Sequence, residues 1–194
     1  MKYILTVTIA LASLLNAQEA ELPGWGVYFG AGMGSASVED DGGLEFGYEP
    51  ALPFIGVNKG FMLGIPMVVN VGLGKRSYSM DIDFGGYKMS QGVSMDYIDI
   101  GAFMPYPLGP GFAQIGALYG TPLGGKVTME MEGEEDTVDI ESDEMDPDYG
   151  LMFSYAYPIN EQLSVNAGYY LGLAEQDDGG PKFNGIFVLL GYTF

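Results

Sequence analysis

The chain has 194 residues, enough for one domain, and it contains neither Cys nor His. Disulfides and thiol chemistry are therefore excluded, and the commonest general base and metal ligand is missing. With 26 Asp+Glu against 7 Lys+Arg the formal net charge is −19, which argues against nucleic acid as a partner and against tight docking on an anionic membrane face. We expect no enzyme, no catalytic residue, no cofactor and no defined metal site.

The first 17 residues have the pattern of a secretory signal peptide. A positive start at Lys2 precedes an uncharged apolar run from Ile4 to Leu15, and Ala17 supplies a small residue for cleavage. The run is too short to cross a bilayer as a helix. We predict a signal peptide over 1–17, with the cleavage site open to a small shift, and a single domain over 18–194.

The first predicted strand alternates cleanly between two faces. The apolar face holds five residues and the other face is mostly glycine, as expected where one face meets lipid and the other a narrow lumen. The apolar face consists of Trp25, Val27, Phe29, Ala31 and Met33. The Gly30–Gly34 run does not fit a dinucleotide loop, because Ser35 stands where the third glycine belongs. Residues 38–49 are predicted to form a long polar loop.

Two strands are expected next, over about 51–62 and 67–80. We place their turn at Leu63–Pro66; the alternative is Asn58–Gly60, a better turn sequence that would leave Pro66 inside a sheet. A loop over 81–91 and a strand over about 93–104 follow. Pro105–Gly111 is predicted to be a tight connection.

The second half of the chain repeats this alternation of strands and connections. Strands are expected from Phe112 to about Leu123, over 148–157 and over 163–173, with a turn at 158–161 and a last loop over 175–182. Residues of about 126–147 form an extended acidic loop. Alternating apolar residues within that loop suggest a hairpin that continues the strands on either side, with its apolar positions at Val127, Met129, Met131, Val138 and Ile140.

The last strand carries an apolar face that ends on an aromatic residue. This face consists of Ile186, Val188, Leu190, Tyr192 and Phe194. Trp25, Tyr157, Tyr192 and Phe194 are expected to gather at one rim as an aromatic girdle. The eight strands, joined by alternately long and short connections, predict an all-β, eight-stranded antiparallel up-and-down transmembrane β-barrel.

Several loose motifs resemble the PorT-like and opacity-type eight-stranded outer-membrane barrel domains. They span Met95–Ile100 before a proline turn, Phe112–Ala117, Asp148–Gly150, Tyr170–Leu173 and Gly191–Phe194. The resemblance implies a Gram-negative-type outer membrane, periplasmic termini, and insertion by the barrel-assembly machinery. In that class the machinery recognises the terminal face ending at Phe194. We further expect a monomer embedded in outer-membrane lipid.

Five polar residues fall on the predicted inner face. They are Arg76, Asp99, Gln114, Asp148 and Asn166, which could form one interior network in which Arg76 pairs with Asp99. Since a buried charge needs a partner and eight strands leave a lumen that side chains can fill, we expect a plugged barrel. The expected function is structural or surface interaction through the acidic loops; the alternative is a narrow channel or transporter for small solutes. The loops could also bind divalent cations diffusely.

Overall fold

Antiparallel strands make up most of the described part of the chain in the computed structural model, which describes residues 24–38, 45–84, 87–131, 134–176 and 179–194. The strands are β1 (Trp25–Ser37), β2 (Glu45–Gly47), β3 (Glu49–Met62), β4 (Pro66–Phe84), β5 (Tyr87–Leu108), β6 (Gly111–Met131), β7 (Glu134–Ile140), β8 (Asp148–Pro158), β9 (Leu163–Gly172) and β10 (Lys182–Thr193). A 3-10 turn, η2 (Ser142–Glu144), links β7 to β8. No helix within the described ranges is long and apolar enough to cross a membrane. The predicted signal peptide lies outside the described residues.

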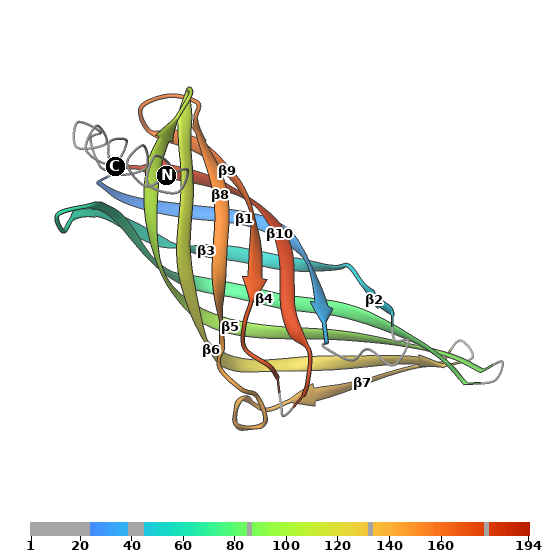
Figure 1. Ribbon diagram of the computed structural model, residues 1–194. Coiled ribbons are helices and arrows are strands. Elements are labelled where there is room, and N and C mark those ends of the chain that lie inside the picture. The colour runs from blue at the N-terminus through green and yellow to red at the C-terminus, as the bar shows by residue number, and fades with distance from the viewer. Residues whose placement is uncertain (1–23, 39–44, 85–86, 132–133, 177–178) are drawn as a thin grey trace, which may run out of the picture.

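Eight of the strands close into a ring (Figure 1). The order around it is β1, β3, β4, β5, β6, β8, β9 and β10, and β10 pairs back onto β1 from Gly26↔Thr193 to Ser37↔Lys182. β2 and β7 lie outside this ring, paired to β4 and β6. The predicted eight-stranded barrel is therefore confirmed, and its strands close without an open edge.

The period-two pattern of the sequence decides which side chains point outward. On β1, Trp25, Phe29 and Met33 are exposed on the outer surface, whereas Gly30 and Gly34 are buried. β10 has the same arrangement, with exposed Val188 and Leu190 beside buried Phe187. A continuous apolar outer surface thus surrounds a lumen that glycines keep open for larger neighbours.

Short turns join the strands at the end of the barrel where the described chain begins and stops (Figure 1). β3 and β4 meet through residues 63–65, with Met62 paired to Pro66, so the predicted turn is right. The alternative turn is excluded because Asn58 pairs with Asn70 within the ladder.

The proline-rich connection after β5 is shorter than predicted. Leu108 pairs with Gly111, so only Gly109 and Pro110 form the turn, and Gly109 takes a φ of 60° that suits glycine. β4 pairs with β5 only as far as Phe103. The prolines at 105 and 107 consequently lie where β5 has a neighbour on one side only, and their missing N–H groups break no ladder.

At the opposite end the strands run well beyond the ring, and three predicted loops need correction. β4 and β5 pair through most of the expected loop 81–91, from Asp81↔Ser90 to Phe84↔Tyr87. The expected loop 38–49 contains β2, and β3 already begins at Glu49. Within 126–147, β7 pairs with β6 as the alternation suggested, but η2 separates β7 from β8, so the two do not form one continuous strand.

These projecting segments form a second feature of the molecule. We call residues 45–47, 79–84, 87–94, 125–131 and 134–140 the protruding sheet, which Figure 1 shows reaching away from the short turns. Apart from β2, which pairs with β4, its strands pair with their neighbours in the chain. The acidic part of the chain is therefore largely ordered strand rather than loop.

The outward apolar face can be tested by placing a charge on it. Val188 lies near the middle of β10 and is exposed on the outer surface. If lipid surrounds this surface, Val188→Arg should lower the free energy of unfolding by about 2–4 kcal/mol, because a charge near the bilayer midplane loses its hydration. Urea unfolding in phospholipid vesicles, followed by the fluorescence of Trp25, the single tryptophan, measures this.

Thr128→Arg is the matched control, since Thr128 lies on the polar face of the protruding sheet. It should change the free energy of unfolding by less than about 0.5 kcal/mol. Equal effects of the two substitutions would contradict a lipid-facing Val188.

Candidate functional site

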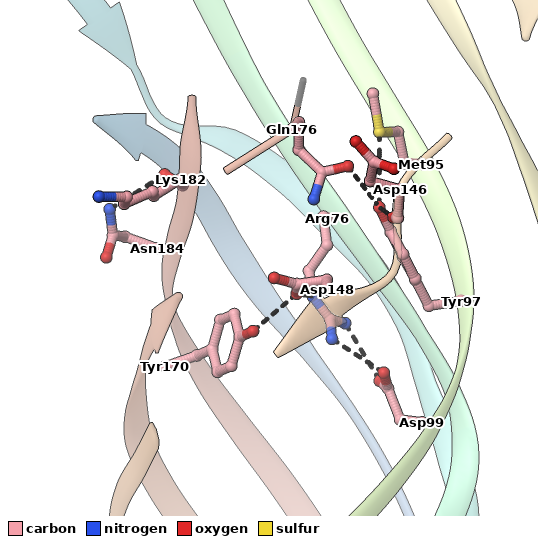
Figure 2. A network of polar contacts seen from close by, with 10 residues as sticks. All are labelled: Arg76, Met95, Tyr97, Asp99, Asp146, Asp148, Tyr170, Gln176, Lys182 and Asn184. Atoms are coloured by element: carbon pink, nitrogen blue, oxygen red, sulfur yellow. Dashed lines mark hydrogen bonds and ion pairs between the residues drawn. The ribbon is translucent and has the colours of Figure 1, made fainter. Parts of the chain in front are cut away.

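One arginine organises the centre of the barrel. Arg76 on β4 reaches Asp99 on β5 through two hydrogen bonds, from Nη1 to Oδ2 (3.1 Å) and from Nη2 to Oδ1 (2.8 Å). Its Nε donates to Oδ2 of Asp148 on β8 at 2.7 Å. All three side chains are buried. A single guanidinium thus holds two carboxylates from β5 and β8, the two strands that flank β6 (Figure 2), and its planar fork allows the bidentate contact.

Two tyrosines enclose the guanidinium. The rings of Tyr97 and Tyr170 lie 5.0 and 4.9 Å from Arg76 Cζ, which is cation–π geometry. The Tyr170 hydroxyl also donates to Asp148 Oδ2 at 2.7 Å, so this oxygen accepts two hydrogen bonds. Asp148 Oδ1 is buried without a partner among the described residues. We call Arg76, Asp99, Asp148, Tyr97 and Tyr170 the charged plug.

Glycines on neighbouring strands make room for the plug. A Cβ at Gly74 would collide with the Asp99 carboxylate, and one at Gly120 would lie 2.8 Å from Asp99 Oδ1 and 3.3 Å from Arg76 Nη2. Gly120 faces Asp99 on one side of β6 and Asp148 on the other. The inward glycines of the sequence therefore have a specific use here, which is to let one long side chain cross the lumen.

The connection between β9 and β10 covers the plug. Gln176 is buried, and its Oε1 accepts a hydrogen bond from the Tyr97 hydroxyl at 3.2 Å (Figure 2). Lys182 closes the connection through an ion pair of 3.0 Å with Glu175. The hydrogen bond and the positive charge of Lys182 lower the pKa of the exposed Glu175 carboxyl. Beyond Gln176, apolar side chains continue the packing: Ala36, Tyr78, Val93, Met145 and Phe183.

The other two predicted interior residues form a separate cluster. Gln114 Oε1 accepts hydrogen bonds from Asn166 Nδ2 (2.9 Å) and Ser154 Oγ (3.1 Å). No hydrogen bond among the described residues joins this cluster to the plug, so the expectation of one network is wrong. Gln114 lies six residues from Gly120 along β6, roughly 20 Å of strand. Between the two levels lie the buried side chains of Phe103, Leu118 and Phe187.

The lumen on the short-turn side is partly hollow. A cavity of about 280 Å³ extends from the Phe103 and Phe187 layer to the turn residues 158–164. Its polar lining is neutral apart from Glu161 near the turn, and amides dominate it, including Asn58, Asn70, Gln114 and Asn166. The barrel is thus closed at the level of Arg76 and hollow on one side of it.

The residues predicted for the girdle and the terminal face all lie on the outer surface. Tyr157 and Trp25 are exposed near strand ends, and the Phe194 N–H donates to the Trp25 carbonyl at 2.9 Å. The rings of Tyr192 and Phe194 meet edge to face at 5.4 Å. Lys59 Nζ lies 4.6 Å from the Trp25 ring centroid. The roles of these residues as girdle and insertion signal stay predictions.

Sequence reasoning did not assign Tyr97, Tyr170 and Gln176 to the interior cluster. Tyr97 and Tyr170 have the inward parity, and Tyr97 lies two residues from Asp99 on the same face, which was a usable signal. Gln176 gave no such signal, because it lies in a connection. Among the described residues, no group of three or more carboxylates is arranged to hold a metal ion.

The plug makes a direct prediction about stability. Arg76→Met should lower the free energy of unfolding by about 3–5 kcal/mol, because it leaves two buried carboxylates without their cation. The triple variant Arg76→Met/Asp99→Asn/Asp148→Asn should recover most of this loss. Unfolding in phospholipid vesicles measures both.

Lys75→Met is the matched control. Lys75 is adjacent on β4, but its ion pair with Asp96 (3.0 Å) lies at the outer surface, so its loss should cost no more than about 1 kcal/mol. A triple variant as unstable as Arg76→Met would show that charge balance is not what the plug supplies.

Comparison with known proteins agrees with this architecture. The chain is similar to Neisserial surface protein A (TM-score 0.56, 12% identity, covering 90% of this chain and 100% of that one). It is also similar to Ail, the attachment invasion locus protein of Yersinia pestis (TM-score 0.52, 12% identity, 89% and 99%). At such identity the likeness shows the fold alone. None of the curated proteins matches the sequence. Residues 16–177 match the family described as outer membrane protein beta-barrel domain, and since this is well over half of the chain, the protein belongs to that family.

Proposed function

We propose that this Gram-negative outer-membrane barrel is a non-enzymatic, monomeric anchor that presents its protruding sheet as an interaction surface outside the cell. The observation that carries the proposal is the contrast between the two halves of the molecule. The lumen is closed by Arg76 and its two carboxylates, whereas β4, β5, β6 and β7 extend past that level as a paired sheet. A barrel that served only to hold the chain in the membrane would not need paired strands beyond the barrel, so the protruding sheet points to an additional role in surface contact.

Several features support the details of this proposal. The ring leaves no open edge for a second copy to join, which favours a monomer. The plug carboxylates are engaged by Arg76 and stand away from solvent, which does not suit acid–base catalysis. Outer-membrane lipid and the barrel-assembly machinery stay the expected partners. The finer resemblance to PorT-like and opacity-type domains, and diffuse divalent binding at the acidic segments, stay predictions.

The orientation follows from the usual arrangement of such barrels, with short turns in the periplasm and long connections outside. On this basis β1 begins and β10 ends on the periplasmic side. The protruding sheet then faces the medium.

A second candidate function is a narrow channel for small solutes. The observation in its favour is the cavity of about 280 Å³, which occupies the lumen from the turn residues up to the layer of Phe103 and Phe187. A solute would still have to pass that layer and the plug.

Planar-bilayer recordings distinguish the two functions. The wild-type protein should show no steady conductance, because the plug fills the lumen. The triple variant Arg76→Ala/Asp99→Ala/Asp148→Ala removes all three charged side chains together and should conduct more than wild type. Steady single-channel currents from wild type would favour the channel.

The absence of cysteine allows a direct test of orientation. Thr137→Cys, on β7, should react with a membrane-impermeant maleimide in intact cells, whereas Asn160→Cys, in the turn after β8, should react only after the outer membrane is permeabilised. The reverse pattern would place the protruding sheet in the periplasm and contradict the proposed function.

A further inference from the structure

The protruding sheet has an apolar face that continues the inner surface of the barrel. Cross-strand partners share a face, and the register forms rows across β4, β5, β6 and β7. The first row starts at Tyr78, the residue just before the protruding sheet on β4, and continues through Val93, Val127 and Val138. The second row is Met80, Gln91, Met129 and Asp136, and the third is Ile82, Met89, Met131 and Glu134. The side chains alternating with these are small or charged, such as Ser90, Thr128, Glu130 and Glu135. The sheet is therefore amphipathic.

The burial of this face decreases toward β7 and toward the outer two rows. Tyr78 and Val93 in the first row are buried among the apolar residues above the plug. Val138, at the β7 end of the same row, is 51% exposed, and in the two outer rows Met129 is 39% and Met131 56% exposed. Exposed apolar side chains gathered on one face indicate a contact surface. Methionine is flexible and polarisable, so four methionines together suit partners of varied shape.

Carboxylates stand beside the methionines on the same face. Asp136 pairs with Met129 and Glu134 pairs with Met131 across the β6–β7 ladder. Lys126 belongs to the opposite face, where it lies 3.6 Å from Asp139. The apolar area thus has an acidic border along β7. Since the whole chain carries a formal charge of −19, a second copy or an anionic lipid surface would be repelled.

We propose that this face binds a cationic amphipathic polypeptide segment, with apolar side chains against the methionines and Lys or Arg against Glu134 and Asp136. The inference rests on the proposed function and names the chemistry of its partner. Electrostatic complementarity would select the segment, and apolar burial would supply most of the affinity.

The test uses the full-length barrel in zwitterionic phosphatidylcholine nanodiscs, with empty nanodiscs as the blank. The probe is a fluorescent ten-residue peptide of alternating Leu and Lys, and fluorescence anisotropy reports binding. The expected result is saturable binding above the blank at micromolar concentration. A Leu–Glu peptide of equal length should not bind. No binding of the Leu–Lys peptide above the blank, or equal binding of both peptides, overturns the proposal.

Matched variants locate the site. Glu134→Gln/Asp136→Asn should weaken binding about five- to tenfold, and Met129→Ser/Met131→Ser should weaken it at least as much. Glu130→Gln/Glu135→Gln removes the same charge from the same two-strand ladder but on the opposite face, so it should change the affinity less than about twofold. Equal weakening by the two charge variants would mean general attraction to an acidic protein and overturn the proposal.

Failure here is distinguishable from failure of the proposed function. If Thr137→Cys is labelled in intact cells while the peptide does not bind, the proposed orientation of the protruding sheet is supported and only the proposed cationic partner is rejected. Heat-modifiable migration on gels confirms that each variant is folded before binding is measured.

Discussion

The need to pair every backbone N–H and C=O within lipid is the constraint on which the rest of this structure depends. A sheet meets it only by closing, and here β10 closes onto β1 over twelve register pairs. Closure with eight strands gives a lumen that is just wide enough for inward-pointing side chains to fill. Everything inside must then be packed, ion-paired or hydrated within that width. The glycines at 74 and 120 and the single arginine between them are consequences of that narrowness.

The charged plug shows how one side chain can organise a lumen. A hydrophobic residue of similar size could fill the space, but it would not connect β4, β5, β8 and β9 through directional contacts. Buried ion pairs often add little net stability, because desolvation offsets the attraction between the charges. Their value here is geometric. The bidentate contact to Asp99 and the single contact to Asp148 fix the distance across the ring at one level, and packing fills the rest.

Much of this could be predicted from the sequence, because period-two alternation follows directly from strand geometry. The outward faces of β1 and β10 and the pairing of Arg76 with Asp99 needed only parity and neighbouring strands. Asp148 lay farther away in the chain, and its contact with Arg76 depends on how the ring curves. The separation of the Gln114 cluster from the Arg76 plug along the barrel axis depends on how neighbouring strands are staggered, and the sequence of one strand does not determine that stagger. The prediction of a loop over 81–91 was wrong. The polar residues and Gly85–Gly86 suggested a loop, although the alternation of side chains on either side of the two glycines fits a pair of strands.

The sheet beyond the barrel obeys different rules from the barrel itself. Within the membrane the outer face must be apolar and the inner face can be polar; in the protruding sheet the same strands reverse this. Outward positions such as Ser90, Thr128 and Asp139 become polar, while inward positions such as Met89 and Met129 become apolar. On β4 and β5 the change occurs without a break in parity, whereas on β6 a register shift opposite Asp96 and Tyr97 moves the inward positions from even residues such as Gly120 to odd residues such as Met129. An apolar face kept on the inner side has no barrel to fill at that height. Its exposure, beside carboxylates on the same strands, is the physical reason to seek the function of this protein there rather than in the lumen.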